Sequence, residues 1–316
     1  MNQLRLFHAT FFAAVFVLLG THAVCARADD GDAPVDTDTS AATAYSNEYV
    51  VVGDKLLLTG GLSQVEGAAG GGLTPWAIIG GYGTRDQVGG NAYYTRVDVQ
   101  DYHLDDAGVL IGINNRIEFS LAKQRFNTED VGVALGLGKS FTLSQNIFGV
   151  KMRIAGDAVL EQDSWLPQIA IGAQYKRNDQ SAVLHAIGAQ SANGTDFYIS
   201  ATKLYMAQSL LLDATVRFTK ANQIGLLGFG GDLHDSYRPQ FEGSLAYLLS
   251  RNLAIGAEYR SKPNNLGIAR ESDWYDAFIT WAPTKHVSLT LAYAYLGNIV
   301  IKDNQRGLYL SVQVGF

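Results

Sequence analysis

The sequence has little cysteine and proline and no excess of basic residues. Its 316 residues include one cysteine, Cys25, and six prolines, and the formal net charge is −6. Nucleic-acid-binding proteins usually carry a basic surface, so this charge balance argues against binding to DNA or RNA. A single cysteine has no intramolecular disulfide partner and cannot build a cysteine-based zinc site.

Long apolar runs are also scarce. One apolar stretch, from about Ala9 to Leu19, follows Arg5 and precedes the small-x-small sequence Ala26-Arg27-Ala28. This is the layout of a secretory signal peptide, and its apolar part is too short to span a bilayer. We predict that residues 1–28 are a cleaved signal peptide, with an N-terminal anchor helix as the less favoured alternative. The mature chain is then secreted, periplasmic or inserted as a β-barrel.

Two unusual segments follow the predicted cleavage site. Residues 29–48 are acidic and have little to bury, which predicts a disordered leader. Residues 49–74 are rich in glycine but lack the Lys-Ser/Thr and the strand–helix context of a phosphate-binding loop. This segment either plugs the interior of the following structure or forms an extra strand or tail. The glycines that would form such a plug are Gly60, Gly61, Gly70, Gly71 and Gly72.

Period-two alternation of apolar and polar residues dominates from Trp76 onward. The clearest cases are residues 287–295 and 308–316, and similar patterns occur at residues 148–154, 212–218 and 253–260. Successive side chains of a strand point to opposite faces, so each segment predicts a strand with one apolar and one polar face. Helical periodicity is weak, and the predicted fold class is all-β.

Strand length, aromatic placement and proline placement favour a transmembrane antiparallel β-barrel over a soluble sandwich. The alternating segments have the length of about 9–11 residues that a tilted membrane strand needs. Tyrosines and tryptophans lie near their ends, as in aromatic girdles, and prolines avoid their interiors. Counting back from the C-terminus predicts about 14 strands, within a range of 12–16, over residues 75–316. The short connections predict periplasmic turns, with the C-terminus on that side.

One region does not fit an even number of strands. Ala186-Ile187-Gly188-Ala189-Gln190 repeats the pattern of residues 170–174, and this repeat predicts another strand. Asn193-Gly194 then predicts a hairpin turn.

The sequence offers few residues for catalysis or metal binding. His103, His185, His234 and His286 follow the predicted signal peptide, and none has a metal-ligand spacing. His234-Asp235-Ser236 resembles a hydrolase triad in composition only, because triad members normally converge from separate segments. We therefore expect no cofactor, no metal and no enzymatic activity, and keep a lipase or deacylase at the rim as a weaker alternative.

The polar faces of the predicted strands carry many charges. Because so many charges cannot face lipid, we expect them to line a hydrated interior. The simpler alternative is that they pair across neighbouring strands and fill the barrel. The candidate lumen-lining residues are Arg96, Asp98, Arg116, Glu118, Lys151, Arg153, Asp213, Arg217, Glu242, Glu258 and Arg260.

The last strand, with apolar residues alternating from Leu308 to Phe316, resembles the final strand of Gram-negative outer-membrane proteins. This resemblance implies contact with outer-membrane lipids and recognition of Phe316 by the barrel-assembly machinery. Residues 56–84 and Trp281-Ala282-Pro283 resemble a proteobacterial outer-membrane family known only as a domain of unknown function, which implies a fold and a location but no activity.

An inward N-terminal segment in a barrel of this size is also similar to the long-chain fatty-acid transporter family. The Asn-Pro-Ala signature of that family is absent here, so its ligand is not carried over. The sequence thus predicts an outer-membrane channel or uptake barrel for an unidentified small molecule. The alternative is a structural or scaffolding barrel that transports nothing.

Overall fold

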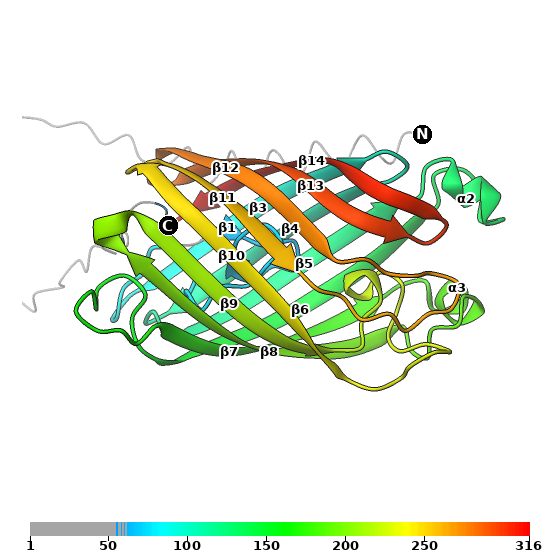
Figure 1. Cartoon of the computed structure of the whole chain (residues 1–316), viewed down its shortest axis with the longest axis horizontal. Helices are drawn as coiled ribbons and strands as arrows, with labels where there is room; N and C mark the ends of the chain where they lie inside the picture. The colour runs from blue at the N-terminus through cyan, green and yellow to red at the C-terminus, as the bar shows by residue number, and fades with distance from the viewer. Residues whose placement is uncertain (1–54, 56–57, 59, 61) are drawn as a thin grey trace, which may run out of the picture. The chain divides into compact units, whose positions relative to one another are not determined.

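In the computed structural model, twelve antiparallel strands form one closed barrel (Figure 1). The structure describes Lys55, Leu58, Gly60 and residues 62–316, so the predicted signal peptide and leader lie outside the described residues. Each strand pairs with its neighbours in the sequence, and the last strand pairs with the first to close the barrel. The strands are β3 (Val88–Val99), β4 (His103–Ile113), β5 (Ile117–Asn127), β6 (Thr142–Ala155), β7 (Gln168–Asn178), β8 (Asn193–Tyr205), β9 (Leu210–Thr219), β10 (Arg238–Ser250), β11 (Leu253–Arg260), β12 (Trp274–Thr284), β13 (Val287–Ile299) and β14 (Lys302–Gly315).

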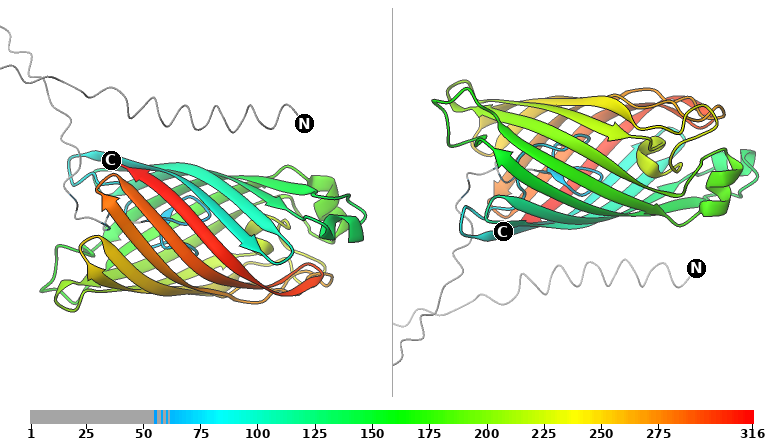
Figure 2. Two further views of the ribbon diagram at one scale, coloured as in Figure 1. Left: turned by 90° about the horizontal axis from the view of Figure 1, so that it is seen from above. Right: turned by 90° about the horizontal axis from the view of Figure 1, so that it is seen from below.

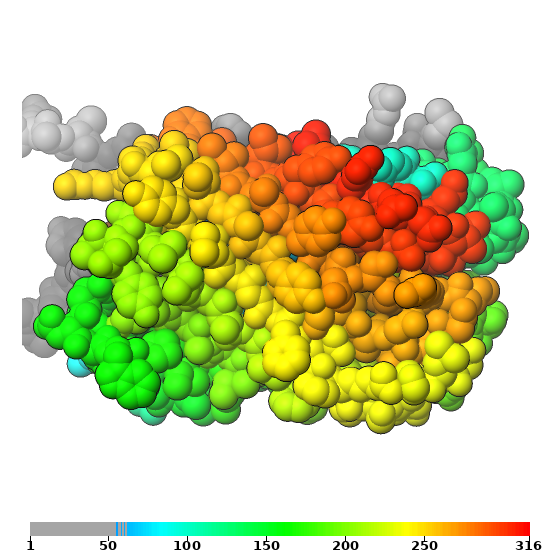
Figure 3. Space-filling view, in the orientation of Figure 1, coloured from blue at the N-terminus to red at the C-terminus, as the bar shows by residue number. Residues whose placement is uncertain are grey.

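The two faces of each strand explain why the sequence folds this way. In β14, Tyr309, Ser311 and Gln313 point inward and are buried, whereas Leu308, Leu310 and Val312 are about half exposed on the outside. The same alternation gives the barrel an apolar outer surface, which suits contact with membrane lipids. Figure 3 shows the face of this surface formed by β10 to β14, in yellow to red.

The connections divide the barrel into two different ends. At the end that carries the C-terminus, four connections are short: residues 114–116, 206–209, 251–252 and 285–286. We name this the turn end, and it also carries the longer connection 156–167. At the opposite, loop end lie the long connections 128–141, 179–192, 220–237 and 261–273.

Short helices occur only in these connections within the described part of the chain. They are α2 (Val131–Ala134), α3 (Ser181–Ala186), and the 3₁₀ turns η1 (Met206–Gln208) and η2 (Gln223–Gly225). Among the described residues, no helix is long and apolar enough to cross a membrane.

The barrel has fewer strands than the predicted number of about 14, and two regions account for the difference. Residues 186–190 are not a strand: they end helix α3 and continue through Gly188, whose φ is +97°. Asn193-Gly194 begins β8 rather than forming a hairpin turn. Ala189 is buried among the loops, as an inward residue of a strand would be. A sequence repeat alone cannot tell these two kinds of burial apart.

The second region is residues 76–83, which precede the first barrel strand and lie inside the barrel. Every residue from 62 to 83 is buried, and we name residues 62–83 the interior segment. It contains a small hairpin of β1 (Leu62–Ser63) and β2 (Ala69–Gly70). Figures 1 and 2 show this segment in blue within the barrel wall. Near its end, Tyr82 N–H donates to the backbone oxygen of Phe316 at 2.9 Å.

Candidate functional site: charged residues around the interior segment

Glu66 is the only charged residue between Lys55 and Arg85, and it lies between β1 and β2 inside the barrel. Its carboxylate is fully buried and forms ion pairs with three cations of the barrel wall. They are Lys176 on β7, Arg217 on β9, with a guanidinium nitrogen at 3.3 Å, and Arg260 on β11, at 2.6 Å. A single acidic residue of the interior segment therefore joins three separate strands.

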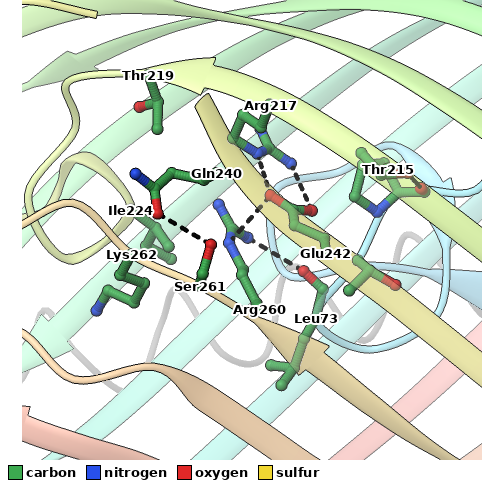
Figure 4. Close-up of polar contacts among 12 residues, drawn as sticks. Leu73, Thr215, Arg217, Thr219, Ile224, Gln240, Glu242, Arg260, Ser261 and Lys262 are labelled. Carbon is green, nitrogen blue, oxygen red and sulfur yellow. Dashed lines mark hydrogen bonds and ion pairs between the residues drawn. The ribbon is translucent and has the colours of Figure 1, made fainter. Parts of the chain in front are cut away.

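The wall supplies two further carboxylates to the same cations. Arg217 lies 3.6 Å from Asp196 and also pairs with Glu242, and Arg260 lies 3.4 Å from the same Glu242. Figure 4 shows Arg217 and Arg260 on either side of Glu242. Three cations thus face three carboxylates. This balance matters because an unpaired charge in a buried site costs several kcal/mol.

A second anchor joins the interior segment to β5 and β6. Glu118 accepts hydrogen bonds from the backbone N–H groups of Ala69, at 3.0 Å, and Gly80, at 2.7 Å. Lys151 lies 3.2 Å from Glu118 and donates to the backbone oxygens of Ala69, at 2.8 Å, and Trp76, at 3.1 Å. Both side chains are fully buried, so the wall charges satisfy backbone groups that the segment cannot pair within itself.

A third anchor lies on β10 and β11. Glu258 accepts hydrogen bonds from the N–H of Leu73, at 2.7 Å, and from the hydroxyl of Thr74, at 2.6 Å. A Cβ atom on Gly71 would overlap this carboxylate, so a larger residue there would displace Glu258 from its hydrogen bonds to the segment. The glycine-rich composition therefore has a close-packing role at this point.

A loop enters the interior from the opposite end. The turn η2, in the connection 220–237, places the Ile224 carbonyl oxygen 3.1 Å from the Lys176 ammonium and 3.2 Å from the Gln145 amide. Gln223 and Ile224 have φ values of 43° and 57°, a left-handed conformation that is strained for a β-branched residue. Lys176 therefore contacts the interior segment and this loop at the same time.

Another buried ion pair holds the loop in place. Lys262 lies 2.8 Å from Glu271 and 4.0 Å from the centre of the Trp274 ring. Glu271 also accepts a hydrogen bond from the Gln223 N–H at 2.7 Å. Burial lowers the pKa of Lys262 to about 8, and burial raises the pKa of Glu271. Burial therefore shifts the pKa of each group in the direction of its neutral form.

The structure places most of the candidate lumen-lining residues inside the barrel. Those with buried inward side chains are Glu118, Lys151, Asp213, Arg217, Glu242, Glu258 and Arg260. Arg153 also points inward, near the turn end, and pairs with Asp157 at 3.0 Å. Their part in transport stays a prediction.

Three of the candidates do not line the interior. Arg96 and Asp98 point outward from β3, where Arg96 pairs with Asp98 at 2.8 Å and Asp105 at 2.9 Å. Arg116 is exposed in the turn 114–116. Alternation identifies two faces but not which one is the interior, and charges are tolerated on the outer face near a membrane interface. Gly61 lies outside the described residues.

Sequence reasoning missed Glu66 and Asp196 as members of the central cluster. The signal for Glu66 was its isolation, since a lone carboxylate in a glycine-rich apolar run needs a cationic partner when it is buried. Asp196 carried no comparable signal, because it follows the Asn193-Gly194 sequence that predicted a turn.

The resemblance of residues 234–236 to a triad is not matched by their surroundings. His234 is exposed, and the Asp235 carboxylate lies 2.6 Å from the Lys220 ammonium. Within the described residues, no group of three or more histidine, aspartate or glutamate side chains could hold a metal ion.

Comparison with known proteins identifies a family and several similar barrels. The family model described as "Protein of unknown function (DUF3034)" matches residues 59–313. No curated protein matches the sequence. The chain is similar to the KdgM porin, with 11% identity and a TM-score of 0.47, over 72% of this chain and 99% of that one.

Two other solved barrels give lower TM-scores. The NanC porin is 12% identical, with a TM-score of 0.43, over 72% of this chain and 98% of that one. Outer-membrane phospholipase A from Escherichia coli is 10% identical, with a TM-score of 0.40, over 72% and 92%. Values this low carry no information about substrate or activity. The similarity to long-chain fatty-acid transporters stays a prediction.

Proposed function

The chain belongs to this family of unknown function, and we propose that it is an outer-membrane channel whose lumen is closed by the interior segment. In this proposal residues 62–83 act as a plug, and the inward charges hold it. When the plug moves, the same charges line a polar path for an unidentified small molecule. The predicted plug of residues 49–74 is thereby extended to Gly83.

The position of Glu66 is the observation that carries this proposal. A twelve-stranded barrel encloses more space than its own side chains fill, because barrels of about eight strands are already packed. Here the space contains a chain segment joined to β7, β9 and β11 by a single carboxylate. Electrostatic anchoring suits a removable plug, since hydration can replace buried ion pairs at lower cost than it can replace apolar packing.

We also propose how the barrel sits in the membrane. The apolar outer surface contacts outer-membrane lipids, with the turn end in the periplasm and the loop end outside. Phe316 is half exposed at the turn end, where the barrel-assembly machinery would recognise it. Its backbone oxygen accepts from both Tyr82 and Gly90, so the end of the last strand and the end of the interior segment are joined there.

The alternative is a structural barrel that transports nothing. The balanced ion pairs around Glu66 and the closely packed glycines favour it, because the charges of that cluster are paired without a ligand. In that case the interior segment is a permanent core.

Single-channel conductance of the refolded mature protein separates the two functions. Deleting residues 62–80 should raise the conductance from near zero to a steady open level. Deletion of residues 29–48, a segment of similar length, is the matched control and should change nothing. Circular dichroism and protease resistance would establish that both variants form barrels. A folded barrel that stays silent after deletion of residues 62–80 would contradict the plug.

A further inference from the structure

Three cations lie close together on the outer surface near the loop end. Lys123 and Arg125 point outward from β5, and Arg177 points outward from β7; all three are exposed. In the strand register, Lys123 is opposite Asn146 of β6, and Asn146 is opposite Arg177. Lys123 and Arg177 are therefore in one row, about 10 Å apart at the backbone.

None of these cations forms an ion pair among the described residues, and Asp105, the register neighbour of Arg125 on β4, pairs with Arg96 instead. Arg96, on the same outer surface, is bound by two aspartates, so nearby cations can be paired where the fold supplies acids. An unpaired cation on the lipid-facing surface is costly at the bilayer centre and nearly free at the headgroup level. The positions of the three cations thus mark a headgroup region.

Apolar side chains form the adjacent row on the side of the barrel midpoint. Leu121, Phe148 and Tyr175 are register neighbours on β5, β6 and β7, and each is about half exposed. The rings of Phe148 and Tyr175 lie 6.4 Å apart. The surface is therefore amphipathic over a short distance, with cations next to an apolar row.

Other strands present a different surface near the same end. There the outward side chains are aromatic, as in an ordinary girdle: Phe197, Phe218, Phe241, Tyr259, Tyr275 and Tyr295. The cluster of three cations is thus a local feature of β5 to β7, whereas β14 presents the single cation Arg306 near this end.

We propose that Lys123, Arg125 and Arg177 bind the phosphate groups of a lipopolysaccharide molecule in the outer leaflet. The phosphates match the three unpaired charges, and charge-assisted hydrogen bonds to phosphate are strong. The acyl chains of the same molecule lie along Leu121, Phe148 and Tyr175. The inference needs the loop end to face outside, and it does not depend on a movable plug.

Binding of purified lipopolysaccharide to the mature protein in neutral detergent tests this assignment. The triple variant Lys123→Gln/Arg125→Gln/Arg177→Gln should bind about a hundredfold more weakly, because each of the three cations near a charged lipid surface contributes about fivefold. The charge-matched control is Arg85→Gln/Arg116→Gln/Arg251→Gln, which removes three exposed cations at the turn end and should bind as the wild type does.

Two further lipids identify what the cluster of three cations recognises. Lipopolysaccharide stripped of its phosphates should bind the wild type as weakly as the intact molecule binds the triple variant. Equal binding of intact lipopolysaccharide by the wild type and the triple variant would overturn the proposal. Phosphatidylglycerol that binds as tightly as lipopolysaccharide, with the same loss in the triple variant, would also overturn it in favour of a general anionic-lipid site.

Discussion

The interior segment and the loop 220–237 enter the barrel from opposite ends and are held in different ways. The interior segment presents backbone N–H groups to the buried carboxylates Glu118 and Glu258, and it brings its own carboxylate, Glu66, to three cations. The loop presents a carbonyl oxygen, that of Ile224, to Lys176, and it does so through a strained turn. The difference indicates that the interior segment is held by more charged contacts than the loop.

Lys176 contacts both the interior segment and the loop 220–237, so its replacement has the largest expected effect. Lys176→Met leaves Glu66 and Asp196 with one cation fewer and removes the donor to Ile224. Loss of one partner from a buried charge cluster costs about 3–5 kcal/mol. We expect this decrease in the free energy of unfolding in urea, together with faster hydrogen exchange in the interior segment and in the loop 220–237.

The control for this variant is Lys220→Met. Lys220 pairs with Asp235 near the surface, where an ion pair contributes at most about 1 kcal/mol. If Lys176→Met accelerated hydrogen exchange in only one of the two segments, that result would contradict a contact of Lys176 with both of them.

The position of the loop 220–237 should respond to pH through Lys262. Burial lowers the pKa of Lys262 to about 8, whereas an exposed lysine titrates near 10.5. Between these values the closed loop binds fewer protons than the open loop, so raising the pH favours closure and lowering it through 8 removes that gain. Over this pH range the free energy of closing the loop should change by about 3 kcal/mol at most.

Hydrogen exchange of residues 220–230, corrected for the intrinsic pH dependence of exchange, measures this effect. Protection of the loop should rise from pH 8 to pH 10.5 in the wild type and stay flat in Lys262→Met. The interior segment should show no such difference between the two proteins. Equal pH dependence of protection in the wild type and in Lys262→Met would show that Lys262 does not cause the effect.

Most of the fold could be predicted from local sequence, because a lipid-facing strand needs regular alternation. Residues 287–295 and 308–316 satisfied that need, and both became barrel strands. Residues 76–83 are buried on all sides and have no lipid-facing side chains. Their apolar character therefore could not show whether they form a strand of the barrel wall or a segment inside the barrel. The same limit applies to residues 186–190, where a short helix and a glycine-rich turn share the composition of a strand.

The candidate site was predicted in part, for a different physical reason. Charges deep in the interior, such as Arg217 and Glu258, have no acceptable outward position and were recognised from alternation. Charges near an end, such as Arg96 and Arg116, are tolerated on either side and were misplaced. The partners of the interior charges could not be predicted, because Glu66 reaches Arg260 across 194 positions of the sequence.

The most direct test of the plug is conductance of the double variant Thr74→Cys/Ser244→Cys. The two hydroxyls are hydrogen-bonded across the boundary between the interior segment and β10. With the predicted signal peptide and its Cys25 removed, the introduced cysteines are the only ones in the chain. The oxidised protein should stay closed under all voltages, and reduction should restore opening events. Identical conductance in the oxidised and reduced states, with the disulfide confirmed by mass spectrometry, would contradict a movable plug.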